Sequence, residues 1–173
     1  KIIKPGTTKE VRTGKEGEIC ICGPTVMLGY LNEPEETANT LKVHPDGNTY
    51  LHTGDVGYKD EEGLIFFTSR LKRMIITSGY NVYPSHVEEI LTNHEAILKC
   101  AVIGIKNESK GEIVKAFIVL REGYNNLLTK SNIQKYMKEN LAKFEIPREI
   151  RYIDDLPTTL VGKIAYKELE KMD

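Results

Sequence analysis

The segment spanning residues 50–83 constrains the fold of this chain more than any other part of the sequence. It alternates short apolar runs with turn signals, and the most distinct of these signals is DEEG at 60–63. Two extended runs joined by a short polar turn that ends in glycine predict a β-hairpin. The expected strands lie at 50–52, 56–59 and 64–68, with the sequence TGD interrupting the first two. The segment therefore predicts a meander or part of a barrel.

The residues before this segment extend the β-rich region. A short strand is expected at 18–22, and the GP dipeptide that follows would end it. A helix is expected from about Pro34 to Leu41, because Asn32 can cap it and two glutamates follow the proline.

A basic cluster at 69–73 separates this region from one of different character. Beyond it, apolar stripes of helical spacing alternate with strong strand signals, which predicts a mixed α+β domain. The expected elements are a helix that begins at Pro84, strands at 97–105, 112–120 and 149–153, a helix from a Ser131 cap to about Leu141, and a final helix at 164–172. The predicted fold class is α+β, with a β-rich partial barrel at 1–71 followed by a small mixed α+β domain at 72–173.

Composition excludes several classes of protein. The chain has 173 residues, 28% of them charged, and a formal net charge of −1, so it lacks a global basic footprint for nucleic acid. No apolar run approaches the roughly 18 residues of a transmembrane segment. Lys1 is not a start methionine and no signal-peptide pattern follows it, so we expect a piece of a longer protein.

Three cysteines, Cys20, Cys22 and Cys100, occupy apolar runs. An odd number of cysteines in such positions favours reduced, buried thiols in a cytoplasmic protein over a disulfide framework. No second Cys or His pair lies at ligand spacing from Cys20 and Cys22, so we expect no metal site.

Two short motifs could carry chemistry. The TGD sequence places Asp55 at a break in a strand, where a carboxylate can accept hydrogen bonds from the paired hydroxyls of a ribose. An aspartate that caps a turn is the alternative. The second motif is Gly162-Lys163, in a loop before the final helix. A lysine on a mobile loop can reach developing phosphate charge, and an ordinary surface lysine is the alternative.

These motifs belong to a larger pattern. Four sequence blocks, in order, resemble the C-terminal portion of the acyl-adenylate-forming superfamily, which comprises acyl-CoA synthetases, nonribosomal adenylation domains and luciferases. The blocks are EICICG at 18–23 with VMLGYLN at 26–32, YLHTGD at 50–55, RLK at 70–72 with GYNVYP at 79–84, and LP…GK at 156–163. Together they cover nearly the whole chain, and their order makes the resemblance far more specific than any single motif.

The resemblance implies roles in nucleotide chemistry. Asp55 and Arg70 would contact the ribose of ATP or AMP, and Lys163 would be the adenylation lysine. Adenylation brings a carboxylate to the α-phosphate, and both groups are negative. A cation placed between them reduces repulsion and stabilises the transition state.

The resemblance also implies a hinge and a path for a thiol. Lys72 would lie at the hinge about which the small domain rotates, in an exposed segment at 71–73. Ser78 and Gly79 would lie near the pantetheine tunnel, where a glycine lets the backbone approach a narrow ligand.

The sequence departs from the family pattern at two places near these residues. Ser69 stands where the family often has glycine before the hinge arginine. Ala165 and Tyr166 stand where an arginine often follows the final lysine. Neither departure touches the residues with implied roles.

The implied function is that of an ATP-dependent acid–CoA ligase, which activates a fatty or aryl carboxylic acid as acyl-AMP and transfers it to CoA. ATP or AMP, CoA and Mg²⁺ are the implied cofactors. The phosphate loop, the magnesium-binding glutamate and most of the acyl pocket would lie in an upstream N-terminal domain, so we expect the chain alone to be inactive. The lysine at 72 favours a CoA ligase over an adenylation domain that loads a carrier protein, which is the first alternative; a non-catalytic interaction module is the second.

Overall fold

The structure, a computed structural model, describes residues 1–172. It divides into two compact units, Lys1–Lys72 and Arg73–Asp173. The first unit is a curved antiparallel sheet with one short helix, and the second is a mixed sheet with helices on both faces. The predicted α+β class, with a partial barrel in the first part of the chain, is confirmed.

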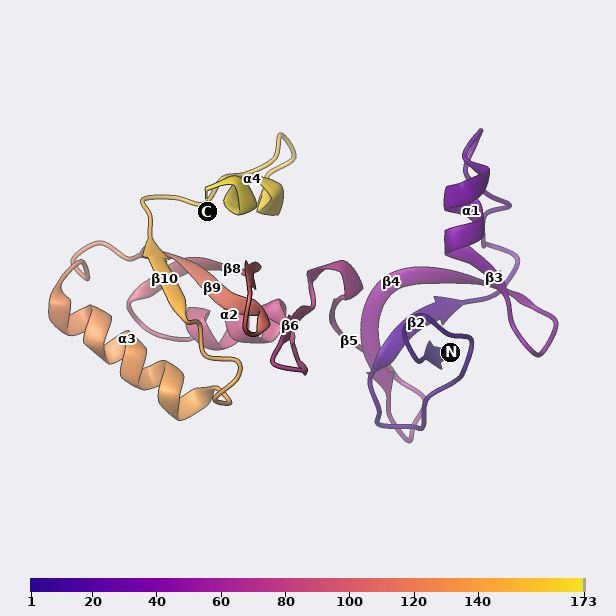
Figure 1. The fold of residues 1–173 in the computed structure, drawn as a ribbon, viewed down its shortest axis with the longest axis horizontal. Coiled ribbons are helices and arrows are strands. Elements are labelled where there is room, and N and C mark those ends of the chain that lie inside the picture. Colours follow the sequence, from indigo (N-terminus) through magenta and orange to yellow (C-terminus); the bar gives the residue numbers. More distant parts are fainter. Residues whose placement is uncertain (173) are drawn as a thin grey trace. The chain divides into compact units, whose positions relative to one another are not determined.

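The first unit is organised around one long strand, β4 (Thr49–Lys59), which has partners on both edges. Figure 1 shows the strong curvature of β4, which gives the sheet its half-barrel form. The other elements are β1 (Ile2–Ile3), β2 (Gly17–Ile21), α1 (Pro34–Thr40), β3 (Leu41–Val43) and β5 (Ile65–Arg70). The sheet order is β1-β2-β4-β3, and β5 pairs with β4.

A bulge in β4 interrupts its pairing with β2. Glu18 pairs with Val56 and Cys20 pairs with His52, so three residues of β4, at 53–55, lie opposite Ile19 alone. An extra residue in one strand bends it and increases its twist, and bulges often re-aim a side chain at a site. Here the bulge falls on the TGD sequence.

The predicted hairpin is confirmed, with longer strands than the sequence suggested. Asp60 Oδ1 accepts hydrogen bonds from the backbone N–H groups of Glu62 and Leu64, which closes the turn between β4 and β5. Two predictions were wrong. β4 continues through TGD because β5 pairs along its other edge, and β5 extends to Arg70 because Arg70 pairs with Asp55.

Two further predictions in the first unit were wrong. Helix α1 has Glu33 at its N-cap without a side-chain hydrogen bond, so Asn32 is not the cap; its φ of 58° places it in the preceding turn. Cys22 is exposed, because it follows the end of β2, whereas Cys20 is buried as predicted.

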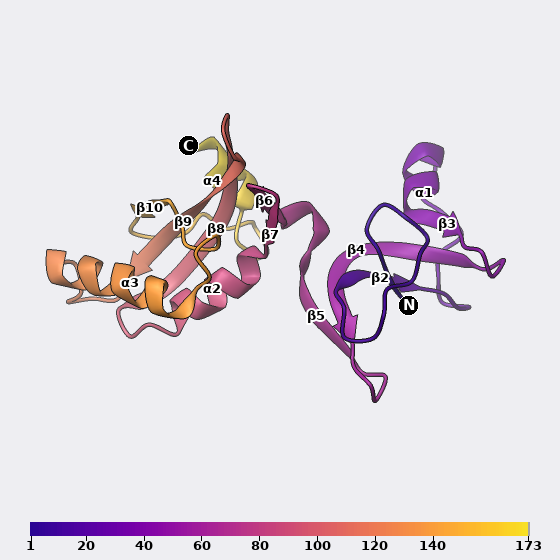
Figure 2. The ribbon, with the colours of Figure 1, turned by 60° about the horizontal axis from the view of Figure 1, so that its bottom comes forward.

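The second unit is built on the long β8–β9 hairpin, whose strands lie side by side in Figure 2. The strands are β6 (Ile75–Thr77), β7 (Tyr80–Val82), β8 (Ile97–Asn107), β9 (Gly111–Leu120) and β10 (Glu149–Tyr152). The helices are α2 (Pro84–Thr92), α3 (Leu127–Asn140) and α4 (Tyr166–Lys171). β10 runs parallel to β9, and the remaining pairs are antiparallel.

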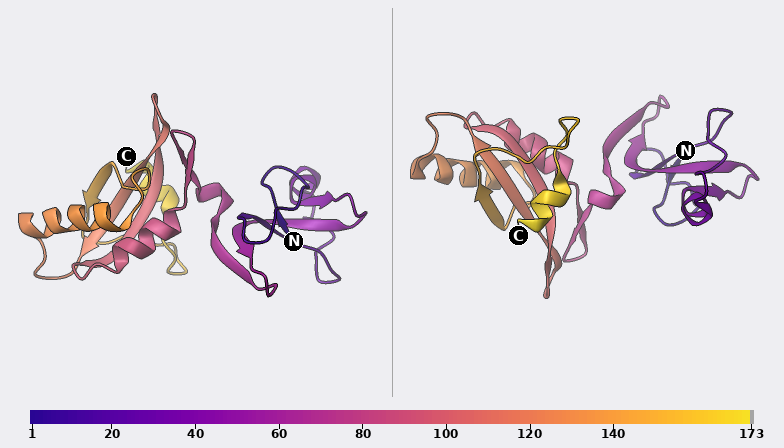
Figure 3. Two further views of the ribbon diagram at one scale, coloured as in Figure 1. Left: turned by 90° about the horizontal axis from the view of Figure 1, so that it is seen from below. Right: turned by 90° about the horizontal axis from the view of Figure 1, so that it is seen from above.

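Both faces of this sheet are covered. Cys100 and Val102 of β8 pack in the core under α2 and α3, whereas Ala101 and Ile103 pack in a second core with Leu169 of α4. Figure 3 shows α2 and α3 toward the viewer in its left view, and α4 toward the viewer in its right view. Because successive side chains of a strand point to opposite faces, a sheet covered on both sides needs continuous apolar runs, and β8 and β9 have them.

The helix starts in this unit differ from the predictions. α3 begins at Leu127, because Asn126 accepts a hydrogen bond from Thr129 N at 2.8 Å and is the true cap, so Ser131 lies inside the helix. α4 begins at Tyr166, because Ile164 still forms a β-bridge with Thr158. α2 begins at Pro84 as predicted, but no side-chain hydrogen bond caps it. Among residues 1–172, no helix has the length and apolar character to cross a membrane.

Candidate functional site: a buried carboxylate and its bulge

Asp55 and Arg70 lie directly opposite each other on β4 and β5. Arg70 Nε is 2.7 Å from Asp55 Oδ1, and the arginine side chain is 62% exposed while that of the aspartate is 27% exposed. Despite this distance, Oδ1 is buried and has no aligned hydrogen-bond donor among the described residues. The arginine thus covers Oδ1, and a ligand hydroxyl could reach only the exposed remainder of the Asp55 side chain, with a cation beside it.

The bulge holds Asp55 through local side-chain contacts. Asp55 N donates to Thr53 Oγ1 at 3.0 Å, and the Thr53 hydroxyl in turn donates to Ile19 O at 2.7 Å. Gly54 has a φ of +72°, a left-handed conformation that glycine adopts without steric cost. The three residues of TGD thus have separate tasks: the threonine hydroxyl holds the bulge, glycine permits the bend and aspartate pairs with Arg70.

A groove of about 500 Å³ lies beside the bulge within the first unit. Thr53, Gly54 and Arg70 line one part of it, and Lys72 lines another. Glu36 and Asn39 contribute from α1. The predicted hinge residue Lys72 therefore lies in the same groove as the predicted nucleotide residue Arg70.

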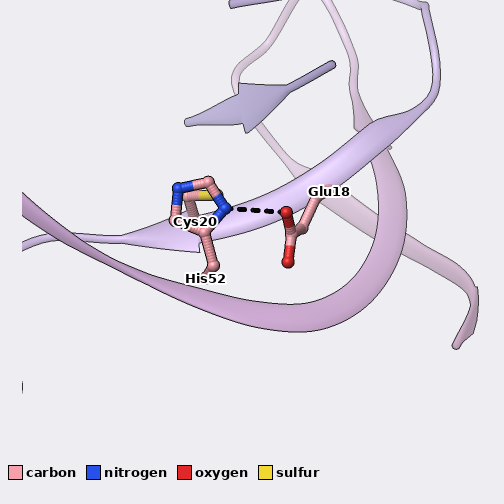
Figure 4. Close-up of side chains that lie close together, drawn as sticks. All are labelled: Glu18, Cys20 and His52. Atoms are coloured by element: carbon pink, nitrogen blue, oxygen red, sulfur yellow. Dashed lines mark hydrogen bonds and ion pairs between the residues drawn. The ribbon is translucent and has the colours of Figure 1, made fainter. Parts of the chain in front are cut away.

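Behind the bulge is a buried cluster that sequence reasoning did not find. Figure 4 shows His52 hydrogen-bonded to Glu18 with Cys20 beside them. His52 Nδ1 is 2.7 Å from Glu18 Oε2, and His52 Nε2 is 3.0 Å from His44 Nε2. One sequence signal was available: Glu18 falls within the family block at 18–23, and His52 falls within the block at 50–55.

Three groups of this cluster could in principle ligate a metal, since the relevant atoms of Glu18, Cys20 and His52 lie within 4.8 Å of one another. Their existing bonds oppose that use. The imidazole and carboxylate already form a short hydrogen bond with each other. Burial raises the pKa of the Cys20 thiol to about 12, so it stays protonated at neutral pH and is a poor ligand. The cluster is satisfied as a hydrogen-bonded network.

Lys163 ends a tight turn of the second unit. Gly162 N donates to Thr159 O at 2.9 Å, and Thr159 N donates to Lys163 O at 2.7 Å. Gly162 has a φ of +77°, which the turn requires. Lys163 is exposed, and within residues 1–172 its ammonium group pairs with no carboxylate. The hydrogen-bonded turn therefore fixes the backbone of Lys163 and leaves its ammonium group exposed.

Ser78 and Gly79 form the two-residue turn of the β6–β7 hairpin. Their φ values are +50° and +82°, and a non-glycine residue rarely adopts the first. A two-residue turn with positive φ at both residues is typical of type I′ hairpins, whose backbone twist matches that of the flanking strands. Ser78 N donates to Lys110 O at 2.9 Å, which ties this turn to the β8–β9 hairpin.

A pocket of about 240 Å³ adjoins this turn. Tyr80 and Phe144 stack in it, with ring centroids 4.6 Å apart and an interplanar angle of 11°. Three cations also line the pocket: Lys110, Lys143 and Arg148. Stacked aromatic rings with cations around them suit a planar ligand that carries several negative charges.

The segment after Lys72 is anchored, not free. Arg73 Nη2 is 2.6 Å from Glu88 Oε1, and the guanidinium lies 3.7 Å from the ring centroid of Tyr166. The prediction that 71–73 is wholly exposed was therefore wrong, since only Lys72 is exposed. Tyr166, a departure from the family pattern, provides the surface on which Arg73 packs.

Comparison with known proteins places this geometry in a family. Residues 86–163 match the AMP-binding enzyme C-terminal domain. These residues belong to the AMP-binding enzyme C-terminal domain family. The predicted resemblance is confirmed.

Three relatives illustrate the similarity to adenylate-forming enzymes. The chain is 43% identical over 162 residues to the 3-[(3aS,4S,7aS)-7a-methyl-1,5-dioxo-octahydro-1H-inden-4-yl]propanoyl:CoA ligase of Rhodococcus jostii strain RHA1, covering 94% of this chain and 30% of that protein. It is 43% identical over 155 residues to the long-chain-fatty-acid–CoA ligase of Bacillus subtilis strain 168, covering 90% and 26%. The crystal structure of ATP-bound MatB from Rhodopseudomonas palustris aligns with a TM-score of 0.87 at 32% identity, covering 99% and 33%. The chain thus spans about a quarter to a third of the length of these relatives.

The structure brings some predicted site residues together and assigns others to separate units. Asp55, Arg70 and Lys72 belong to the first unit, whereas Ser78, Gly79 and Lys163 belong to the second. The roles given to these six residues stay predictions.

Proposed function

We propose that the chain forms part of an ATP-dependent acid–CoA ligase, which activates a fatty or aryl carboxylic acid as acyl-AMP and then transfers the acyl group to the CoA thiol. The observation that carries this proposal is the Asp55–Arg70 pair. A partly exposed carboxylate, paired through its buried oxygen with an exposed arginine, suits the 2′- and 3′-hydroxyls of a ribose. The curated relatives named above are CoA ligases, which supports the same class of reaction.

Lys163 would supply the cation for the first step. The acid's carboxylate attacks the α-phosphorus of ATP, an O–P bond forms, and pyrophosphate leaves with the electrons of the broken P–O bond. A lysine ammonium near the attacking carboxylate and the α-phosphate offsets the negative charge that both contribute. The exposed turn and the unpaired ammonium of Lys163 suit this task.

The second step would use the surface around Ser78 and Gly79. The CoA thiol loses its proton to solvent and its sulfur attacks the acyl carbon. The thioester C–S bond forms, the C–O bond to the phosphate breaks, and AMP leaves with the electrons of that bond. The pocket with Tyr80, Phe144 and three cations supports CoA as the thiol donor, because its nucleotide part is planar and carries phosphates. A carrier-protein phosphopantetheine lacks that nucleotide and would leave the pocket unused, which disfavours the first alternative.

Lys72 is the proposed hinge residue between the two steps. Because Arg73 is tied to Glu88 and Tyr166, backbone rotation at 73 would break an ion pair and a stacking contact. Rotation about the exposed Lys72 would not, so Lys72 suits a hinge better than its neighbour.

The chain alone is proposed to be inactive and to act with an upstream domain of the same protein. Four consecutive apolar residues in and before β5, at 64–67, are exposed in the first unit, which suits coverage by further chain. The family resemblance assigns Mg²⁺ to a glutamate upstream, and no residue of this chain is proposed to hold it. A cytoplasmic location remains part of this proposal.

The test uses the intact ligase and its Lys163→Ala variant. Wild type should release pyrophosphate from ATP in the presence of fatty or aryl acids, and the variant should lose adenylation by orders of magnitude. Thioester formation from supplied acyl-adenylate and CoA should survive in the variant. Lys167→Ala removes another exposed lysine four residues later and is the matched control.

Three outcomes would contradict the proposal. Equal loss of both steps in Lys163→Ala would make the lysine structural. Transfer to a carrier protein but not to CoA would favour the first alternative. Absence of pyrophosphate release with every acid tested would favour the non-catalytic interaction module.

A further inference from the structure

The bulge in β4 leaves backbone donors that the sheet cannot satisfy. Where three residues oppose one, the ladder of β2 and β4 lacks acceptors for Gly54 N and Asp55 N. Thr53 Oγ1 accepts from Asp55 N at 3.0 Å, and Glu18 Oε1 accepts from Gly54 N at 3.0 Å. Two side chains thus replace the missing strand partner, and one of them is a buried carboxylate.

The Glu18 carboxylate is only 6% exposed, so its charge must be compensated by hydrogen bonds. Oε1 takes the Gly54 N–H, and Oε2 lies 2.7 Å from His52 Nδ1. Both oxygens therefore have donors, one from the bulge and one from a ring that is itself 8% exposed. The carboxylate bridges the bulge to the interior of the sheet.

His44 fixes the direction of this network. Its Nε2 is 3.0 Å from His52 Nε2, and one proton must lie between the two nitrogens. Burial and the neighbouring His52 lower the pKa of His44, which favours its neutral form. With His52 Nδ1–H donated to Glu18, a neutral His52 accepts at Nε2 from His44 Nε2–H. Each of the three contacts, His44 to His52, His52 to Glu18 and Gly54 to Glu18, then has one donor and one acceptor.

We infer that Glu18 is a positioning residue for the nucleotide site: it holds Gly54 through one oxygen and His52 through the other, and so fixes the bulge that aims Asp55. This inference rests on the proposed role of Asp55 in binding ribose. Glu18 also lines the groove beside the bulge, but the role inferred here needs no contact between Glu18 and a ligand. It acts through the backbone N–H of Gly54, the residue that precedes Asp55.

The network also predicts which substitutions the site tolerates. In Glu18→Gln, the amide oxygen can still accept from Gly54 N, while the NH₂ group donates to His52 Nδ1. The two imidazoles then exchange donor and acceptor roles, and every hydrogen bond is retained. Glu18→Ala loses both contacts, and Glu18→Asp keeps the charge on a stem too short to reach Gly54 and His52 together.

The experiment measures the KM for ATP, the KM for CoA and the Kd for AMP in the intact ligase. Glu18→Ala should raise the KM for ATP and the Kd for AMP about tenfold, which is the loss of one hydrogen bond to a charged group, and leave the KM for CoA unchanged. Glu18→Gln should stay within about threefold of wild type. Glu16→Ala, which removes an exposed glutamate two residues earlier, is the control and should resemble wild type.

An unchanged Kd for AMP in a folded Glu18→Ala variant would overturn the inference. So would parallel increases in the KM values for ATP and CoA without rescue by Glu18→Gln, because general damage to the fold predicts that pattern. If Glu18→Ala does not fold, Glu18→Asp carries the test, and an unchanged Kd for AMP would again overturn it. A wild-type enzyme that binds AMP but adenylates no acid would contradict the proposed function, while the AMP affinities still test Glu18.

Discussion

The guanidinium of Arg73 packs on the ring of Tyr166, 3.7 Å from its centroid, and both side chains contact Glu88 Oε1. The first residue of the second unit is thereby joined to the start of α4, three residues after Lys163. Glu88 also accepts from Val102 N at 2.9 Å, so the cluster includes strand β8. The Glu88 carboxylate thus holds both the first residue of the second unit and the start of the helix that follows the Lys163 turn.

Tyr166→Ala should destabilise the second unit by about 2–4 kcal/mol, because it removes a partly buried ring together with its cation–π contact. Tyr166→Phe keeps the ring and loses only the hydrogen bond to Glu88 at 3.2 Å, so its cost should be about 1 kcal/mol. Urea unfolding followed by circular dichroism measures both. Equal costs for the two variants would show that the stacking contributes nothing.

Lys143→Ala should raise the KM for CoA about tenfold and leave the KM for ATP unchanged, because the lysine lines the pocket beside Ser78. The KM for CoA of the wild-type ligase should also rise with ionic strength. Steady-state kinetics of the intact enzyme measures both effects. Lys138→Ala, which removes an exposed lysine outside this pocket, is the control. A CoA dependence that is the same in both variants would exclude the pocket as a CoA site.

Ser69→Ala should leave the free energy of unfolding unchanged or raise it by up to about 1 kcal/mol. Ser69 is 1% exposed, and its Oγ has no hydrogen-bond partner among the described residues. A buried hydroxyl without a partner costs stability, so its removal relieves a penalty. Thermal unfolding of the two proteins measures the difference. A loss of more than about 1 kcal/mol would mean that the hydroxyl has a partner, such as a bound water.

The stability of the first unit should fall as the pH drops from about 7 to 5. Burial and His52 lower the pKa of His44 below its ordinary value near 6.5, so the unfolded chain binds a proton that the folded chain resists. The stabilising contribution is therefore present above the unfolded pKa and is lost as the pH falls below it. Urea unfolding at a series of pH values measures this slope. His44→Asn should flatten it, and an identical slope in the variant would contradict the assignment.

Local sequence signals predicted the elements whose causes are local. The DEEG turn, the start of α2 at Pro84 and the β8–β9 hairpin were all predicted, because each depends on residues within a few positions. The start of α3 was missed, since Asn126 and Ser131 are both acceptable caps and the sequence does not choose between them. The predicted domain boundary between 71 and 72 stays a prediction about the intact enzyme.

The sequence by itself determined the family, the order of its blocks and the identity of Asp55, Arg70 and Lys163 as candidates, because these depend on residue type and spacing. Only the tertiary structure decided what supports them. Glu18 meets Gly54 across 36 positions, and Tyr166 meets Glu88 across 78. Such contacts depend on strand register and on how helices cover a sheet, which no local pattern specifies. The bulge in β4 exists because a distant carboxylate satisfies its backbone, and that pairing emerges only when the chain is folded.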